Sequence, residues 1–321
     1  MLKQRVITAI VLLLVFILAL WSESGYLFIA LTLLLIGAAG WEWSRLAGWS
    51  GQRAWASGAL CALGAVVVPA VVLAVALADE VRVMVSHGIE TQDALLASPL
   101  WKVVDAKENR AIFWYMAVAG VLWVVGGAWL LRRGVASWSV LPRWLRWGVG
   151  MVMLIVAWSA LVWMWGMSTN YLLSCLAVAW VADSGAYFFG RALGGKFTGG
   201  RKLAPGISPG KSWEGAVGGL ICVWLAGAIW VAVDRAWQLT DSLYTSLWQA
   251  GAAWFFGGLA LLTAMSVVGD LTESLVKRAA GVKDSSALLP GHGGVLDRID
   301  ALLPLLPLAL VVNGLAVAGW R

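Results

Sequence analysis

Residues 55–78, "WASGALCALGAVVVPAVVLAVALA", contain no charged side chain. A helix of about 20 apolar residues is long enough to cross the ~30 Å hydrocarbon core of a bilayer. Similar runs recur along the 321-residue chain, which is 61% hydrophobic and 12% charged, whereas soluble domains carry roughly 25% charged residues. The composition therefore excludes a soluble globular protein and predicts an all-α, polytopic integral membrane protein.

Apolar runs of this kind predict about nine transmembrane helices. The runs cover residues 5–21, 25–41, 55–78, 111–131, 147–166, 170–190, 213–233, 251–270 and 300–319. An odd number of crossings puts the two ends of the chain on opposite sides of the membrane. The first run follows a basic start, as in a signal peptide, but it lacks a small-x-small cleavage site and a second run comes at once, so we expect it to be retained.

Basic residues near the ends of the runs predict the orientation, because lysine and arginine are retained on the cytoplasmic side of short loops. They cluster before the first run and after the second, fourth, sixth and eighth runs: Lys3, Arg5, Arg45, Arg53, Arg132, Arg133, Arg143, Arg146, Arg191, Lys196, Arg201, Lys202, Lys211, Lys277, Arg278, Lys283 and Arg298. The opposite loop at 79–110 holds six acids against four bases. The pattern predicts a cytoplasmic N-terminus.

Polar residues are unevenly distributed along the chain. Residues 1–170 predict transmembrane helices with a structural, lipid-facing role, and residues 171–321 predict a transmembrane catalytic region with two cytoplasmic polar loops. The cysteines Cys61, Cys175 and Cys222 lie inside apolar runs, which indicates packing rather than a disulfide or metal framework. The basic residues form no clustered face of the kind that binds nucleic acid, so no nucleic-acid partner is expected.

The first polar loop belongs to the stretch "ADSGAYFFGRALGGKFTGGRKLAPGISPGKSWEG" at 182–215. Asp183 lies at membrane depth, where a bare carboxylate costs about 2.5–3.5 kcal/mol and so calls for a metal, a cation or a water-filled cavity. Glycines interleaved with bases are typical of phosphate cradles, and Ser212 is placed to cap a following helix. An ordinary basic cytoplasmic loop with flexible glycines would have the same composition, so both a phosphate-binding loop and an ordinary loop remain possible interpretations.

The second polar loop belongs to "DLTESLVKRAAGVKDSSALLPGHGGVLDRID" at 270–300. Asp270, Asp297 and Asp300 bracket bases and a glycine pair, a combination that favours Mg²⁺ held by carboxylates together with substrate phosphates. Ordinary salt bridges are the alternative. His292 is either a general base or, as is commoner for a lone loop histidine, a residue that orients its neighbours through hydrogen bonds. Because both polar loops open to the cytoplasm, we expect them to meet at one site.

The second loop resembles the signature of a known family, the phosphatidate cytidylyltransferases or CDP-diacylglycerol synthases. Many fixed positions at fixed spacing carry the resemblance: Ser274, Lys277, Arg278, Lys283, Asp284, Ser286, Pro290, His292, Gly293, Gly294, Asp297, Arg298 and Asp300. The upstream stretches "DSGAYFFGR" and "SPGKSWEG" are also similar to that family. The specific likeness covers roughly residues 180–300, and the first five runs share only their hydrophobicity.

The resemblance implies that the phosphate of phosphatidic acid attacks the α-phosphorus of CTP, giving CDP-diacylglycerol and pyrophosphate with Mg²⁺ as cofactor, which could act with a second cation. It implies these roles by residue: catalysis by Asp270, Asp297, Lys277, Arg278, Lys283 and Arg298; substrate binding by Ser208, Lys211, Ser212, Glu214, His292, Gly293 and Gly294; metal binding by Asp270 and Asp297, with Asp183, Asp284 and Asp300 as further metal-site or orienting residues. The partners are then CTP, phosphatidic acid and membrane lipids.

Three other functions fit parts of the sequence. A transporter of anions would also place polar residues within apolar helices, but it should show paired, inverted broken helices. A CDP-alcohol phosphatidyltransferase would need a D-G-x-x-A-R motif that this sequence lacks. A CTP-dependent lipid kinase is the closest rival, and its products distinguish it.

Two further expectations concern assembly and location. Small residues in the apolar helices are compatible with a homodimer. The compact chain without a transit peptide predicts a bacterial cytoplasmic (inner) membrane, with the active site facing the cytoplasm.

Overall fold

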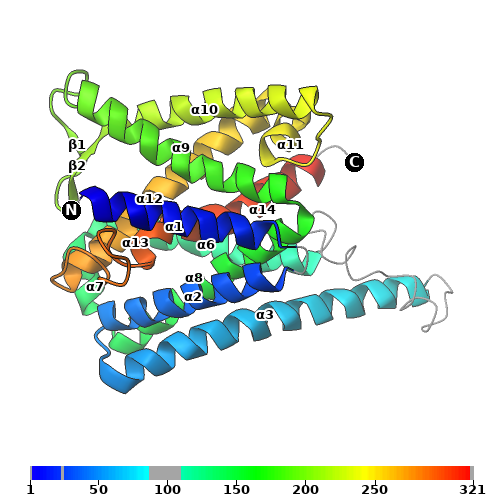
Figure 1. Ribbon diagram of the computed structural model, residues 1–321, viewed down its shortest axis with the longest axis horizontal. Coiled ribbons are helices and arrows are strands. Elements are labelled where there is room, and N and C mark those ends of the chain that lie inside the picture. The colour runs from blue at the N-terminus through cyan, green and yellow to red at the C-terminus, as the bar shows by residue number, and fades with distance from the viewer. Residues whose placement is uncertain (1, 23–24, 87–109, 319–321) are drawn as a thin grey trace.

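The computed structural model describes residues 2–22, 25–86 and 110–318, which form a bundle of helices (Figure 1). Within these ranges eight helices are long and apolar enough to cross a membrane, and α1 adds the shorter apolar stretch Val6–Leu20. The prediction of an all-α, polytopic membrane protein is therefore confirmed. Each of the nine apolar runs falls on a helix, while nine crossings and a cytoplasmic N-terminus stay predictions.

The elements follow one another in this order: α1 (Leu2–Leu20), α2 (Tyr26–Leu46), α3 (Gly51–Ser86), α6 (Arg110–Arg133), α7 (Val135–Val140), α8 (Arg143–Met167), α9 (Thr169–Leu193), β1 (Lys202–Ala204), β2 (Ser208–Ser212), α10 (Trp213–Ala236), α11 (Leu243–Ala250), the π-helix η1 (Trp254–Gly258), α12 (Leu259–Ala279), α13 (Leu296–Ile299) and α14 (Leu302–Ala318). Most of the acidic loop predicted at 79–110, residues 87–109, lies outside the described residues.

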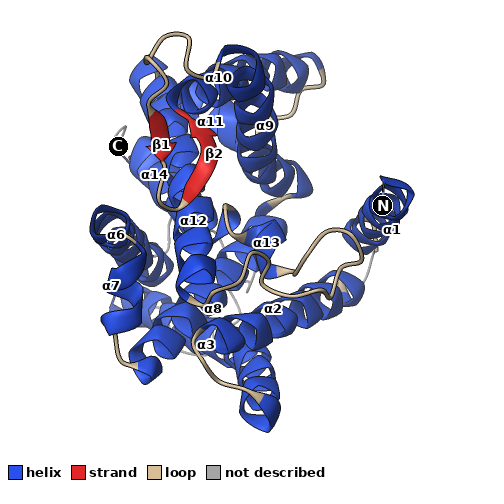
Figure 2. Cartoon of the chain, turned by 90° about the vertical axis from the view of Figure 1, so that its left-hand side faces the viewer, coloured by secondary structure: helices blue, strands red, loops and turns tan. Residues whose placement is uncertain are grey.

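The two polar loops lie at the same end of the bundle, as the topology predicted (Figure 1). The hairpin β1–β2, the short helix α13 and the start of α1 lie at this end, and α14 finishes at the other. Figure 2 looks onto the end with the loops and shows α12 and α13 near its centre, with the hairpin beside them. We call it the loop end of the bundle.

Glycines allow α9 and α10 to pack closely, which brings the first polar loop against the bundle. A Cβ added to Gly219 of α10 would lie 2.6 Å from the carbonyl oxygen of Ala182, and one added to Gly185 of α9 would lie 2.9 Å from the Cβ of Cys222. Small residues at a helix interface let backbones approach in this way. The pair therefore forms a rigid wall beside the site.

The structure differs from the sequence-based expectation in two places that matter for the site. The eighth apolar run was expected to end at Asp270, but α12 continues to Ala279. Residues 202–212, expected to be loop, instead form an antiparallel hairpin in which Lys202 pairs with Ser212 and Ala204 with Ser208. Hydropathy shows only where a run of apolar residues ends. It therefore could not predict that α12 continues through its polar last third, or that the glycine-rich segment forms a hairpin.

The core of the bundle is α14, whose span at Leu296–Val317 is 78% buried. It packs against α6, α8 and α12, so the segment that precedes it is held from several sides. The cysteines are free, as expected, and Cys61 and Cys175 are buried among apolar residues.

Candidate active site

The first polar loop is fastened to the N-terminal end of α10 by Glu214. One carboxylate oxygen of this buried side chain accepts from the backbone N–H groups of Phe197 and Thr198 at 3.2 and 3.0 Å and from the Thr198 hydroxyl at 2.7 Å. Ser212 caps α10 as predicted, because its Oγ accepts from the N–H of Gly215 at 3.1 Å. Glu214, predicted to bind substrate, thus shapes the loop in this structure.

A polar cavity of about 490 Å³ opens between α9, the hairpin and α12. Several predicted site residues line it: Asp183, Ser208, Lys211, Ser212 and Asp270. Arg191 and Tyr187 of α9, which were not predicted, also belong to its lining. Lys211 and Asp270 form an ion pair across the cavity wall, which joins the first polar loop to α12, while a meeting of the two polar loops stays a prediction.

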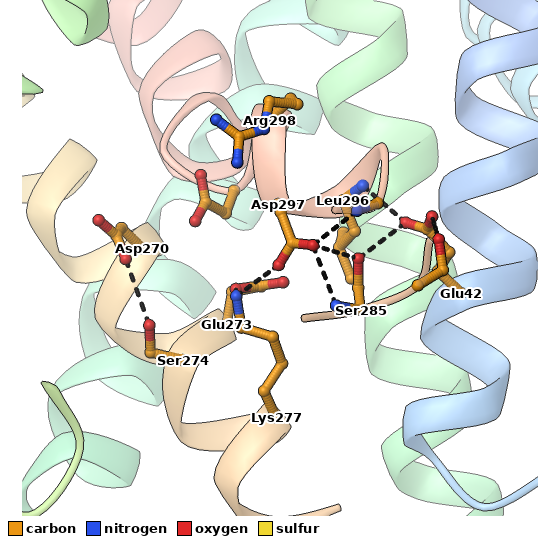
Figure 3. Close-up of polar contacts among 12 residues, drawn as sticks. Glu42, Asp270, Glu273, Ser274, Lys277, Ser285, Leu296, Asp297 and Arg298 are labelled. Atoms are coloured by element: carbon orange, nitrogen blue, oxygen red, sulfur yellow. Dashed lines mark hydrogen bonds and ion pairs between the residues drawn. The ribbon is translucent and has the colours of Figure 1, made fainter. Parts of the chain in front are cut away.

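Polar and charged side chains follow Asp270 along one face of α12. Ser274 donates to Asp270 at 3.3 Å, and Lys277 forms an ion pair with Glu273 one turn before it. Lys277 also donates to Oδ1 of Asp297 at 2.5 Å (Figure 3). Because the side chains of Glu273 and Asp297 are only 2% and 6% exposed, Lys277 balances two nearly buried carboxylates.

Asp297 organises the second polar loop from its centre. Its Oδ2 accepts from the N–H of Gly294 at 2.8 Å and from the N–H and hydroxyl of Ser285 at 3.0 and 2.9 Å. Gly293 has φ +84, and a Cβ there would lie 2.7 Å from the same oxygen. The glycine at 293 is therefore explained by its turn and by its closeness to Asp297.

The remaining residues of the signature lie around this centre. Arg298 donates to the carbonyl oxygen of His292 at 2.8 Å, which closes the loop, and the Nδ1 of His292 is buried without a partner among the described residues. Oδ1 of Asp300 accepts from the N–H of Ala301 at 2.7 Å. A further group is solvent exposed: Arg278, Lys283 and Asp284.

Two carboxylates line the polar cavity, Asp183 of α9 and Asp270 of α12, and a third, Asp300, lies within electrostatic range of both. Asp183, Asp270 and Asp300 interact electrostatically, each with the other two. Among the described residues, no group of three His, Cys, Asp or Glu side chains is arranged to enclose a metal ion by itself. Mg²⁺ is usually held by one or two carboxylates together with substrate phosphates and water, and Asp183 and Asp270 at the cavity offer oxygens of that kind.

Besides Arg191 and Tyr187, the sequence did not predict Glu273 and Glu42 as site residues. Glu273 lies in the quoted stretch three residues after Asp270, and the helical spacing would have placed both on one face if α12 had been expected to continue. Glu42 of α2 is fully buried and bonds the second polar loop across more than 240 positions in sequence. Its only signal was a carboxylate near the end of an apolar run.

An apolar groove of about 690 Å³ adjoins the polar cavity. It runs between α10, α12, the hairpin and the α6–α7 turn, and Ala264, Leu220 and Leu271 are among its lining residues. Leu203, Ala216 and Val267 line both spaces. A ligand with a polar head and apolar tails could therefore occupy the two together.

Comparison with known proteins agrees with the resemblance of the signature. A model of the cytidylyltransferase family matches residues 3–315. The phosphatidate cytidylyltransferase of Pseudomonas aeruginosa is 37% identical over 322 residues, covering 100% of this chain and 99% of the relative. The enzymes of the same name from Haemophilus influenzae and Brucella suis are 48% identical over 136 residues and 49% over 128, which is 42% and 40% of this chain and 43% and 40% of the relatives. The likeness thus extends well beyond residues 180–300.

Proposed function

The chain belongs to the cytidylyltransferase family, and we propose that it transfers the cytidylyl group of CTP to phosphatidic acid, giving CDP-diacylglycerol and pyrophosphate. The observation that carries the proposal is the junction of a polar cavity with an apolar groove at Leu203, Ala216 and Val267. The reaction needs such a junction, because one substrate is a soluble polyanion and the other keeps its acyl chains in the bilayer.

In this reaction an oxygen of the lipid phosphate forms a bond to the α-phosphorus of CTP. The bond from that phosphorus to the bridging oxygen of the β-phosphate breaks, and pyrophosphate leaves with the electron pair. The attacking phosphate is already ionised, so the step needs no strong general base. Catalysis then rests on positioning and on neutralising charge, and His292 serves to shape its loop.

The basic residues of the loop end supply that neutralisation. Lys211, which lines the polar cavity, would contact the triphosphate, and Lys277 would contact the phosphate that reacts. Exposed bases at the rim would attract both polyanions from the surface. They are Arg278 and Lys283, with Arg298 beside them.

Mg²⁺ is the cofactor we assign, and when bound it would supply positive charge to the triphosphate, with or without a second cation. Asp270 and Asp297 are its proposed ligands, and Asp183 and Asp300 lie within electrostatic range of Asp270. Oδ1 of Asp297 already accepts from Lys277. Lys277 and a metal ion therefore compete for this oxygen, and we expect Lys277 to turn toward substrate phosphate when the ion is held.

The apolar groove provides the sharpest test of the substrate. Ala264 lines the groove but not the polar cavity, so Ala264→Trp should raise KM for long-chain phosphatidic acid about tenfold or more, given the 1–3 kcal/mol cost of overpacking. KM for CTP and turnover of a short-chain, water-dispersed phosphatidic acid should hardly change. The matched control is Ala252→Trp, at an exposed position outside the groove. Equal effects of both variants, or none on lipid KM, would count against this groove as the lipid site.

Location follows from the same features. Integral membrane placement is given by the helices, and the relatives compared are bacterial. Lysine and arginine are retained on the cytoplasmic side of short loops. The basic loops around the site therefore support an active site on the cytoplasmic face of the inner membrane.

A further inference from the structure

Glu42 of α2 is a fully buried carboxylate in a helix that is otherwise mainly apolar. Burying a carboxylate costs several kcal/mol unless its oxygens are well satisfied. None of the ion pairs within the described part of the chain involves Glu42. Its negative charge must therefore be balanced by hydrogen bonds.

Within the described residues, the hydrogen-bond donors to Glu42 all come from the second polar loop. One oxygen, Oε1, accepts from the N–H of Val295 at 3.0 Å and from the Ser286 hydroxyl at 2.5 Å. The other, Oε2, accepts from the N–H of Leu296 at 2.7 Å and from the Ser285 hydroxyl at 3.1 Å. The Glu42 carboxylate is thus hydrogen-bonded to both ends of the segment 285–296.

The same segment holds Asp297 in place. The Ser285 hydroxyl lies within hydrogen-bond distance of both Glu42 and Asp297, at 3.1 and 2.9 Å, so a single O–H group links the two carboxylates. Figure 3 shows Glu42 on one side of the loop and the α12 residues Glu273 and Lys277 on the other, with Asp297 and Ser285 between them.

Gly294 gives an independent indication that this contact is built into the loop. A Cβ at this position would lie 2.0 Å from Oγ of Ser285 and 2.4 Å from Oε1 of Glu42. Only glycine allows the backbone to approach the two groups so closely. The Gly294 of the signature is therefore explained here by its contact with Glu42, whereas its predicted role at the substrate stays a prediction.

We propose that Glu42 is a positioning residue, which clamps the segment 285–296 from the N-terminal half of the chain and so holds Asp297 against Lys277. It touches neither substrate nor the reacting atoms. The effect of Glu42 on catalysis rests on the proposed function, whereas its effect on the structure of the segment 285–296 does not. The clamp makes the first helices part of the active site.

The test compares Glu42→Gln with Ser44→Ala. The amide of Gln would present N–H to loop N–H or O–H donors, whereas the Ser44 hydroxyl is equally buried on the same helix and donates to Gly40 of that helix at 2.9 Å. Hydrogen–deuterium exchange of the substrate-free, metal-free protein should be about 10- to 100-fold faster across 285–296 in Glu42→Gln, since hydrogen bonds to charged groups contribute about 1.5–3 kcal/mol. Peptides from α9 and α10 should be unchanged, as should every peptide of Ser44→Ala.

Activity provides the second measurement. In Glu42→Gln we expect kcat to fall about 10- to 100-fold, as is typical when support of a metal or catalytic ligand is lost, and the Mg²⁺ concentration for half-maximal activity to rise. KM for CTP should change little. Ser44→Ala should keep wild-type kinetics.

If Glu42→Gln does not fold, Ser286→Ala removes one clamp contact, leaves Glu42 with its donors from Ser285, Val295 and Leu296, and should show the same pattern more weakly. Unchanged exchange across 285–296 in the folded variant would overturn the clamp. Faster exchange with normal kcat and Mg²⁺ dependence would overturn its role in positioning. If the wild-type protein transfers no cytidylyl group, the proposed function fails, while the exchange experiment still decides whether Glu42 holds the loop.

Discussion

Lys277 is the cation that joins α12 to Asp297 of the signature. It bridges Glu273 and Asp297, and the side chains of all three are 12% exposed or less. We expect one cation shared between two acidic side chains to be able to turn toward substrate phosphate. The consequence is that Lys277 has both a structural and a chemical role.

Replacing Lys277 by Met should therefore lower stability as well as activity. Two nearly buried carboxylates would lose their partner, and removing one member of a buried pair costs about 3–5 kcal/mol. Thermal unfolding in detergent should show a clear fall in Tm. In the double variant with Glu273→Gln, we expect Tm to recover substantially while turnover stays abolished, and recovery of activity would contradict a chemical role for Lys277.

Asp270 should behave differently, because its side chain is 27% exposed and faces the cavity. Asp270→Asn should keep the protein abundant in the membrane with a nearly unchanged Tm, yet lower kcat by at least about 100-fold, the range for loss of a group that stabilises the transition state. The control is Asp234→Asn. Asp234 is a buried aspartate that Asn170, Ser242 and Thr245 bind at the opposite end of the bundle, and this variant should retain turnover. Normal kcat in Asp270→Asn would refute the metal assignment.

At the residue scale the sequence predicted a good part of the site. Fixed spacing identified Asp270, Lys277 and Asp297; the structure joins Lys277 to Asp297 and pairs Asp270 with Lys211. Glu42 could not be found in this way, because its partners lie in another part of the chain and only the packing of α2 against the loop joins them. The roles assigned to individual residues stay predictions.

Among the elements, the packing of α9 against α10 is what holds the hairpin and Lys211 over α12. The contact depends on glycines where any Cβ would strike backbone, as at Gly219. Lipid tails offer little hydrophobic drive for association, so close packing of small residues supplies much of the attraction between such helices.

Gly219→Ala should thus destabilise the bundle by about 1–3 kcal/mol, the usual cost of overpacking, because the new methyl group meets the carbonyl oxygen of Ala182. A fall in Tm and in CTP turnover is expected. Gly126→Ala on α6 is the matched control, since a Cβ there has nothing within 4 Å. If the two variants unfolded at the same temperature, the close approach of α9 and α10 would not be important for stability.

Helices were also the elements that the sequence predicted best. Each apolar run became a helix within several residues, because hydrocarbon length and hydropathy together decide where a span lies. The β1–β2 hairpin was missed, since it is polar, short and fixed by contacts such as those of Glu214.

For the whole molecule, one end of the bundle carries the site and the basic loops, and the opposite end carries α11 (Figure 1). A cytoplasmic loop end predicts that a membrane-impermeant thiol reagent will label Lys196→Cys in inverted vesicles and not in intact cells. Thr240→Cys, exposed in the turn before α11, should show the reverse. Labelling of Lys196→Cys from outside intact cells would invert the predicted topology.

The most direct test of the central claim is a product assay of the purified, detergent-solubilised protein with CTP, phosphatidic acid and Mg²⁺. We expect CDP-diacylglycerol and pyrophosphate to form in equal amounts, formation to stop with EDTA, and excess Mg²⁺ to restore it. A folded sample that released CDP and a phosphorylated lipid would instead be a kinase, and one that formed neither product would contradict the cytidylyl transfer proposed for this site.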